Sequence, residues 1–270
     1  MEELTKENYR SNHDYLSFTT FSKYLDCEAA AKAHFREPST TAMLVSSYVD
    51  AYFSGELEQF KMENPEIFTK NGELKKEFQQ ANNIIARIES DETFMKAMSG
   101  EKQKIMTGEI LGVPFKIKMD SYIPGKAIVD LKVMKDFKPV WSNAYHRYTN
   151  FIEAYDYEIE LALFQEIVYQ NTGKKLPCYI ACITKEEPSD VAILSFPQEK
   201  LDEAMEIIKN RLPRIKKILN GEVAPHRCNI CAYCRMTKKA QIINFELVGF
   251  DGDQLREEGI ECDDPIQKEE

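Results

Sequence analysis

The stretch Lys118-Met-Asp120-Ser-Tyr-Ile-Pro-Gly125-Lys-Ala-Ile-Val-Asp130-Leu-Lys132 predicts a β-hairpin that carries two carboxylates and a lysine. Pro124-Gly125 is a turn dipeptide, and apolar and β-branched residues alternate on both sides of it. Asp130 and Lys132 are two residues apart in the second strand, so their side chains point to the same face. A turn of three or five residues would place Asp120 opposite Asp130 on that face, roughly 5 Å away.

Two carboxylates facing each other across a hairpin repel, so the pairing calls for a chemical explanation. A divalent cation between them removes the repulsion, because hard cations prefer carboxylate oxygen as a ligand. A lysine beside such a metal can orient a water nucleophile or stabilise charge on a phosphate. The alternative is an ordinary amphipathic hairpin with solvated charges, since a register slip of one residue would separate Asp120 from Asp130.

Asp120, followed by Asp130-Leu-Lys132 ten residues later, resembles the signature of the PD-(D/E)xK nucleases, and the run from Ala127 to Lys132 is similar to that of their RecB-like branch. Further segments resemble phage exodeoxyribonuclease VIII-like proteins, and the resemblance extends over residues 17–240. It implies a mixed α/β (α+β) fold with a restriction-endonuclease-like core, in which helices flank a central mixed sheet and the N- and C-terminal parts add further helices. The similar segments are residues 21–30, 45–53, 165–175 and 228–235.

The resemblance implies a metal-dependent DNA exonuclease that resects linear duplex ends by phosphodiester hydrolysis. Asp120, Asp130 and the carbonyl of Leu131 would hold Mg²⁺ or Mn²⁺, and Lys132 would position or activate the attacking water. The implied partners are double-stranded DNA ends, a single-strand annealing recombination protein of the phage type, and further copies of the chain in a homo-oligomer. Two alternatives stay open, a non-catalytic DNA-binding or structural module that keeps the fold and an endonuclease.

Asp50 is a further candidate ligand of the catalytic metal. The segment Ser46-Ser-Tyr-Val-Asp50 stands where the RecB-like family carries a Gly-x-x-x-His pattern whose histidine completes the metal site. A carboxylate binds Mg²⁺ or Mn²⁺ at least as well as an imidazole does. The resemblance therefore implies a site of three carboxylates, and the alternative is a solvated Asp50 on an amphipathic helix.

The same family carries a Gln-x-x-x-Tyr pair on a helix that faces the DNA, and two registers of this chain are similar to it. Glu160 and Phe164 keep the surrounding apolar pattern but change both letters, whereas Gln165 and Tyr169 keep the letters five residues further on. Five residues rotate a helix by about 140°, so both pairs cannot serve one site. We favour the Glu160 register for DNA binding. The ordinary interpretation of Gln165 and Tyr169 is an exposed amide and a partly buried phenol.

Cys228, Cys231 and Cys234 form a dense C-x2-C-x2-C cluster. Three thiolates need a fourth ligand to close a tetrahedral Zn²⁺ site or to hold a cubane. The resemblance implies Cys27 as that ligand, around a 4Fe–4S iron–sulfur cluster that joins the two ends of the fold. A Cys₃His zinc site with His226 and a set of thiols without metal are the alternatives.

The composition fits one globular domain over residues 1–250, with a cysteine-rich segment at 226–239 and a partly disordered acidic tail at 251–270. Hydrophobic residues make up 43% and charged residues 30% of the 270. The net charge of −10 excludes a histone-like DNA binder but allows a local basic channel. An odd cysteine count of seven without a secretion signal indicates the cytoplasm, and no apolar run approaches the ~18 residues of a membrane span.

Periodicity predicts helices and strands in the order that this fold requires. We expect a loop or short helix over residues 136–149, where aromatic residues are frequent. The expected helices are residues 21–35, 40–53, 73–90, 151–171 and 198–219, and the expected strands are 102–110, 113–122, 127–133, 177–184 and 191–196.

Overall fold

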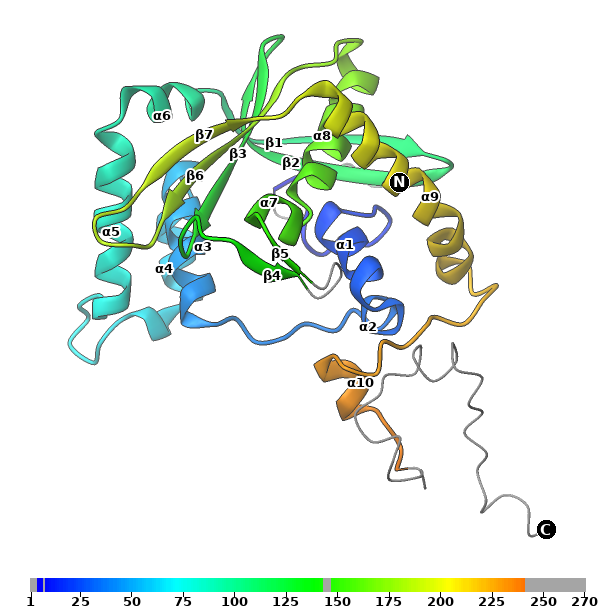
Figure 1. The fold of residues 1–270 in the computed structure, drawn as a ribbon. Helices are drawn as coiled ribbons and strands as arrows, with labels where there is room; N and C mark the ends of the chain where they lie inside the picture. The colour runs from blue at the N-terminus through cyan, green and yellow to red at the C-terminus, as the bar shows by residue number, and fades with distance from the viewer. Residues whose placement is uncertain (1–3, 7, 143–146, 241–270) are drawn as a thin grey trace. The chain divides into compact units, whose positions relative to one another are not determined.

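The computed structural model describes residues 4–6, 8–142 and 147–240, and the chain divides into two compact units (Figure 1). The first, here called the sheet unit, comprises residues 1–18 and 38–212. The second, the cysteine unit, comprises residues 19–37 and 213–270. The acidic tail expected at 251–270 lies outside the described residues.

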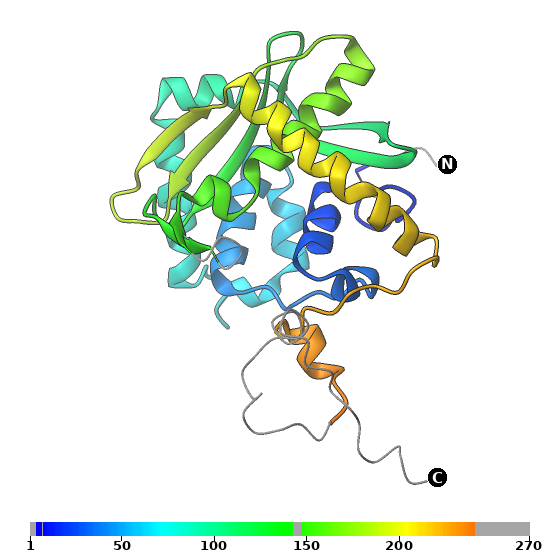
Figure 2. The ribbon, with the colours of Figure 1, turned by 45° about the vertical axis from the view of Figure 1, so that its right-hand side comes forward.

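A five-stranded mixed sheet forms the centre of the sheet unit, which confirms the predicted fold class. Its strand order is β1-β2-β3-β6-β7, with β3 and β6 parallel and every other neighbouring pair antiparallel. Figure 2 shows β6 and β7, in yellow-green, running beside β3. The strands are β1 (Glu101–Ile110), β2 (Val113–Ile123), β3 (Ala127–Met134), β6 (Cys178–Thr184) and β7 (Val191–Ser195).

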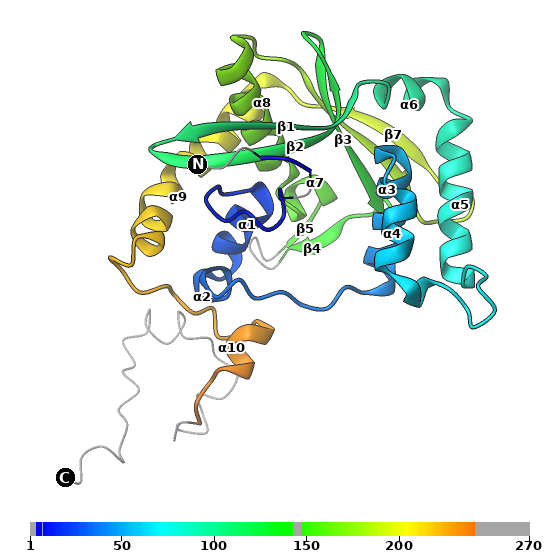
Figure 3. The same cartoon turned by 180° about the vertical axis from the view of Figure 1, so that it is seen from behind.

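Helices cover both faces of this sheet because its central strands are apolar on both sides. Val129 and Leu131 of β3 join a buried cluster with α3 (Thr41–Ser54) and α5 (Lys76–Glu89). Ile128, Asp130 and Lys132 alternate with them and face the other way, toward α8 (Tyr157–Thr172). Figure 1 and Figure 3 show α5 and α8 on opposite sides of the β3–β6 pair.

The turn between β2 and β3 has three residues, as one of the two expected geometries requires. Ile123 pairs with Ala127, and the N–H of Lys126 donates to the carbonyl of Ile123 at 2.9 Å. Gly125 has a φ of 67°, a left-handed conformation that glycine adopts without steric cost. One step beyond the last ladder pair, Ser121 with Val129, the same register sets Asp120 across from Asp130.

Backbone breaks divide two of the predicted helices. The helix expected over residues 21–35 ends at Asp26 and restarts at Glu28, because Cys27 is extended and caps the second piece. The helix expected over 151–171 forms as α7 (Phe151–Ala154) and α8, because Asp156 has a φ of 55°. These are α1 (Phe18–Asp26), α2 (Glu28–Lys32), α7 and α8.

The loop or short helix expected over residues 136–149 is wrong, because part of this segment forms a two-stranded ribbon. Its strands are β4 (Val140–Ser142) and β5 (Arg147–Thr149), and Trp141 pairs with Tyr148 across them. Aromatic residues favour strands, and an opposed aromatic pair stabilises a short ribbon.

The remaining elements are short helices that the hydrophobic periodicity did not predict and one long helix, α9 (Gln198–Leu219), that it predicted. Thr40 caps α3 through the N–H of Met43, and Gly55 and Gly173 end α3 and α8 in the left-handed conformation. No helix among the described residues is long and apolar enough to span a membrane. The elements are α4 (Leu57–Glu63), a 3₁₀ turn (Pro65–Ile67), α6 (Glu92–Ala97), α9 (Gln198–Leu219) and α10 (Ala232–Met236).

Candidate active site and cysteine cluster

Lys132 lies between two carboxylates at the centre of the candidate site. Its Nζ is 2.7 Å from Oδ2 of Asp130 on the same strand and 2.7 Å from Oε2 of Glu160 on α8. The ring of Tyr157, one turn before Glu160, lies 4.6 Å from the same Nζ. Burial alone would lower the pKa of Lys132, but Asp130 and Glu160 outweigh it and hold that pKa well above its ordinary value. The lysine is therefore an ammonium ion at neutral pH.

Asp130 keeps an oxygen that could bind a cation. Its Oδ2 lies at ion-pair distance from Lys132, yet within the described part of the chain that buried atom makes no hydrogen bond of good geometry. The 2.7 Å contact is thus an ion pair between the ammonium and the carboxylate. A buried carboxylate oxygen left in this state is a ready ligand for a divalent ion.

The side chain of Asp120 lies next to the point where the hydrogen-bonded ladder between β2 and β3 ends. Its Oδ2 accepts the backbone N–H of Leu131 at 2.8 Å, and its Oδ1 accepts the side-chain amide of Gln103 at 3.0 Å. Burial raises the pKa of Asp120 well above its usual range, and the nearby charges of Asp130 and Asp50 raise it further. Asp120 therefore lies within electrostatic reach of both other predicted ligands.

Asp50 lines a cavity of about 260 Å³ together with Lys132 and Tyr157. Burial raises the pKa of Asp50; Asp130 adds to this increase, whereas Lys118 and Lys132 oppose it. The side chain is thus neither remote from the hairpin nor fully solvated. The other residues that line the cavity are Ser46, Ser47, Leu131 and Val133.

The donor set fits a hard divalent cation. Several carboxylates surround Lys132, and burial and Asp130 raise the pKa of Glu160 to about 7 despite the nearby ammonium. A cation would relieve this excess of buried negative charge. Among the described residues, only cysteines form a group of three or more metal-ligand side chains within 4.8 Å of one another. The carboxylates of Asp50, Asp120 and Asp130 therefore do not all lie within that distance of one another.

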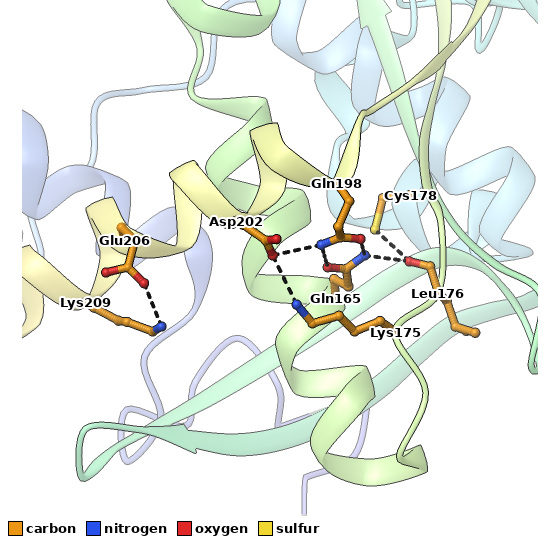
Figure 4. Close-up of polar contacts among 8 residues, drawn as sticks. All are labelled: Gln165, Lys175, Leu176, Cys178, Gln198, Asp202, Glu206 and Lys209. Atoms are coloured by element: carbon orange, nitrogen blue, oxygen red, sulfur yellow. Dashed lines mark hydrogen bonds and ion pairs between the residues drawn. The ribbon is translucent and has the colours of Figure 1, made fainter.

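The residues predicted to bind DNA on α8 do not share one environment. Glu160 points to Lys132, whereas Phe164 and Gln165 are buried, with Gln165 only 4% exposed. The amide of Gln165 donates to the carbonyl of Leu176 at 2.8 Å and exchanges hydrogen bonds with Gln198 of α9 (Figure 4). Phe164 and Gln165 therefore offer DNA no accessible surface, because α9 and the sheet enclose this side of α8.

The ordinary interpretation of Gln165 and Tyr169 is wrong for Gln165 only. The amide of Gln165 is buried rather than exposed, whereas Tyr169 is 45% exposed and is thus a partly buried phenol, as expected. Figure 4 shows the network that draws Gln165 inward, which continues from Gln198 to Asp202 and Lys175. A helix position that matches a motif by letters can thus lie on the wrong face.

Two residues of the candidate site, Gln103 and Tyr157, were not predicted from the sequence. Gln103 lies across β1 and β2 from Asp120, between the ladder pairs Lys102–Ser121 and Lys104–Met119, and has a φ of 52°. That register could have been inferred from the β1–β2 turn, but the positive φ could not. Tyr157 lies three residues before Glu160, so helical spacing would have found it once Glu160 was assigned to Lys132.

Four thiols gather in the cysteine unit. The Sγ atoms of Cys27, Cys228, Cys231 and Cys234 all lie within 4.8 Å of one another, with Cys27 3.6 Å and Cys228 3.9 Å from Cys234. The fourth member is thus Cys27 and not His226. Although burial opposes it, backbone hydrogen bonds from Cys228 and Ala30 lower the pKa of Cys27 to about 7.

Glu28 holds the two cysteine-bearing segments together. Its carboxylate accepts two hydrogen bonds from Arg214, at 2.5 and 2.7 Å, and one from the backbone N–H of His226 at 2.7 Å. The N–H of Ala29 in turn donates to the carbonyl of His226 at 2.9 Å. These contacts fix the segment before Cys228 against the segment that begins at Cys27.

The cluster is compact enough for a single metal ion. Zinc with Zn–S bonds of about 2.3 Å separates its tetrahedral sulfurs by about 3.8 Å. The two separations from Cys234, 3.6 Å to Cys27 and 3.9 Å to Cys228, agree with that value, and all four sulfurs lie within 4.8 Å of one another. A cubane binds each thiolate to a different iron and therefore spreads the four sulfurs farther apart.

Comparisons with known proteins show the family and the fold of the chain. A family model described as "PDDEXK-like domain of unknown function" matches residues 17–237. The crystal structure of a protein described as "Putative exonuclease" from Eubacterium rectale is 44% identical, covers 93% of this chain and 100% of that one, and has a TM-score of 0.86.

The crystal structure of SSO0001 is 14% identical, covers 83% of this chain and 96% of that one, and has a TM-score of 0.30, which is too low to support an argument. No curated protein matches the chain. On the family model and the 44% identical structure, the chain belongs to the family of PDDEXK-like domains.

Proposed function

We propose that the protein is a metal-dependent exodeoxyribonuclease that hydrolyses phosphodiester bonds at the ends of linear duplex DNA. The observation that carries the proposal is the arrangement of Asp120, Asp130 and Lys132 on adjacent strands, with Asp120 bonded to the backbone of Leu131. The description of the 44% identical structure as a "Putative exonuclease" supports the same activity. Resection of this kind would leave single strands for an annealing recombination protein.

Asp120 and Asp130 would hold Mg²⁺ or Mn²⁺, with Asp50 and the carbonyl of Leu131 completing the protein ligands. The clustering of buried carboxylates supports this assignment, because burial and the charges of Asp130 and Asp50 raise the pKa of Asp120 and a divalent cation would offset that negative charge. When bound, a divalent ion lowers the pKa of a coordinated water and offsets charge on the scissile phosphate.

Lys132 would act as a hydrogen-bond donor and not as a general base. Its ammonium is stabilised by Asp130 and Glu160, so it has no lone pair with which to take a proton from water. It can instead donate to the attacking water or to a phosphate oxygen, where negative charge grows in the transition state. Glu160 keeps the ammonium near Asp130, and the Tyr157 ring limits the directions it can take.

The four thiols of the cysteine unit would hold a structural metal ion. Their spacing supports one Zn²⁺, whereas the family resemblance points to an iron–sulfur cluster. Either group would join the segment around Cys27 to the segment around Cys234. No step of hydrolysis is assigned to it.

The test compares end-labelled linear duplex DNA with closed circular DNA, each with and without Mg²⁺. An exonuclease degrades only the linear DNA, and only with the metal present. The matched control is Asp130→Asn, which should abolish the degradation and thereby exclude a contaminating nuclease. Cutting of circles would replace the proposal with an endonuclease, and intact DNA of both kinds would replace it with a non-catalytic DNA-binding module.

A further inference from the structure

The β4–β5 ribbon presents two aromatic rings to solvent on the face where a ribbon ordinarily carries polar residues. Trp141 and Tyr148 are directly opposite each other, with ring centroids 5.4 Å apart at 76°. Trp141 is 49% exposed and Tyr148 is 68% exposed. A short ribbon gains stability from such a pair, but this does not require so large an exposed aromatic area.

The opposite face of the ribbon is fixed to the protein. Thr149 is buried, and its hydroxyl and the guanidinium of Arg147 both bond to Glu153 of α7. Residues alternate between faces along a strand, so this anchoring turns Trp141 and Tyr148 outward. The aromatic pair is therefore displayed on a supported element.

Aromatic contacts connect the base of the ribbon with the candidate active site. Phe137, just before β4, stacks on Phe151 of α7 with centroids 5.6 Å apart at 19°. Phe151 contacts Tyr157, whose ring lies beside the Lys132 ammonium. Tyr155, an exposed ring at the end of α7, lies 5.7 Å from Tyr157. Exposed aromatic rings are thus found both on the β4–β5 ribbon and at the end of α7.

Cations accompany these rings. Lys135 and Lys138 are strongly exposed, and their nearest carboxylates, on Asp136 and Glu186, are 3.9 and 3.8 Å away. Exposed ion pairs of this length contribute little stability, so the ammonium groups can turn to a phosphate at small cost. Rings for bases and cations for the backbone are the combination that binds single-stranded nucleic acid.

We propose that the ribbon is a stacking site for the bases of single-stranded DNA, with Trp141 and Tyr148 as its platform. This inference deepens the proposed function, because it assigns the frayed strand of a DNA end to a surface continuous with the active site. The ribbon would receive unpaired bases, while Lys135 and Lys138 contact the phosphates. A duplex interior offers no base faces to these rings, so the site selects ends over continuous duplex.

The only tryptophan of the chain provides the test, since stacking on a base quenches indole fluorescence. The full chain is titrated with a single-stranded dT₁₂ oligonucleotide without added divalent ion, so the strand stays intact and the cysteine unit keeps its metal. An abasic strand of equal length is the control for phosphate contacts alone. Quenching by dT₁₂ and not by the abasic strand is expected.

Variants locate the site by the anisotropy of labelled dT₁₂. Trp141→Ala and Tyr148→Ala should each weaken binding about 10-fold, as expected for one lost stacked base. Trp141→Phe keeps a ring and should bind nearly as the parent protein does. Tyr52→Ala removes an exposed ring elsewhere in the sheet unit and should change nothing.

Three results would overturn the proposal: no quenching, equal quenching by the abasic strand, or unchanged affinity of both alanine variants. The failures of the two proposals are distinguishable. Quenching without any Mg²⁺-dependent cleavage would remove the exonuclease and keep the stacking site. Cleavage of linear DNA by a protein whose Trp141 fluorescence does not respond to dT₁₂ would keep the exonuclease and remove the stacking site. The ribbon would then be a surface for a protein partner.

Discussion

The ammonium of Lys132 lies 2.7 Å from a carboxylate oxygen of Glu160, which stands 28 residues later on the helix that leads from β3 to β6. The hairpin supplies Asp120, Asp130 and Lys132, but the second anchor of the lysine comes from outside the hairpin. Glu160 is largely buried, and among the residues that the structure describes its carboxylate hydrogen-bonds only with Lys132. The site therefore depends on the packing of α8 against the sheet.

Glu160→Ala should lower the rate of DNA hydrolysis about 10-fold, because the ammonium loses one of two anchors and small displacements of a catalytic group are costly. Glu160→Gln should lose less, since the amide oxygen can still accept from the ammonium. The measurement is kcat at saturating Mg²⁺. The control is Glu166→Ala, whose carboxylate on the same helix contacts Gln170. A parental rate in Glu160→Ala would show that Lys132 needs no second anchor.

Asp120→Asn, Asp130→Asn and Lys132→Ala should each reduce nuclease activity by about 100-fold or more while leaving the fold intact, as for the loss of a group that stabilises transition-state charge. Asn fits at position 120 because a flipped Gln103 can present its unpartnered Oε1 to the new amide. Circular dichroism checks the fold, and the linear-DNA assay checks the activity. Full activity in any variant would remove the role assigned to that residue.

Local chemistry in the sequence predicted the hairpin well. Pro124-Gly125 fixed the turn, and the register placed Asp120 across from Asp130. The role of Gln103 could not be predicted, because it depends on a positive φ that only the folded environment maintains.

The positions of several candidate residues depend on tertiary packing, which the sequence motifs do not encode. The letters of Gln165 and Tyr169 match the family pair, yet Gln165 turns inward to Gln198, and Glu160 is the residue that reaches the site. Cys27 was identified as the partner of the C-terminal cysteines only through the resemblance, since nothing local in the sequence marks the helix break at that position. The β4–β5 ribbon has three residues in each strand, too few for alternation to be recognised.

Asp50→Ala should raise the Mg²⁺ concentration that gives the half-maximal rate by about 10-fold, as expected for the loss of one carboxylate ligand. Asp50→Asn keeps one oxygen in the same place and should have an intermediate effect. The measurement is a Mg²⁺ titration of the initial rate. If both titrations superimpose on that of the parent protein, Asp50 is a cavity residue without a metal role.

Glu158→Gln should stabilise the protein at pH 8 and have little effect near pH 5. Burial raises the pKa of Glu158 from 4.5 to about 7, and its buried Oε2 has no hydrogen-bond partner within residues 4–6, 8–142 and 147–240. The folded protein thus holds this proton more tightly than the unfolded chain does, so stability is lost as the pH rises from the unfolded pKa through the folded one. Since the side chain is partly exposed, we expect a gain of about 1–2 kcal/mol, below the value of the full shift.

Urea unfolding at both pH values measures that gain. Glu206→Gln is the control, because Glu206 makes an exposed ion pair with Lys209 (Figure 4). Equal stabilisation by Glu158→Gln at pH 5 and pH 8 would mean that the carboxylate does not titrate in this range.

The purified protein should contain one zinc ion per chain and be colourless. The separation of 3.6 Å between the sulfurs of Cys27 and Cys234 matches a tetrahedral ion, and these residues are 207 positions apart. Closing so long a loop lowers the entropy of the unfolded chain and thereby raises its free energy by about 5 kcal/mol in the chain-entropy model. Removal of the metal should therefore expose the segments around both cysteines to proteolysis and leave the Asp120–Lys132 hairpin protected.

Metal analysis of protein purified without oxygen tests this prediction directly. Cys27→Ser should lose the zinc, whereas Cys182→Ala, which removes a buried thiol of β6 outside the cluster, should keep it. Broad visible absorbance with about four irons per chain would instead identify a cubane, as the family resemblance implies. In that case the four sulfurs must lie farther apart than a single tetrahedral ion would hold them.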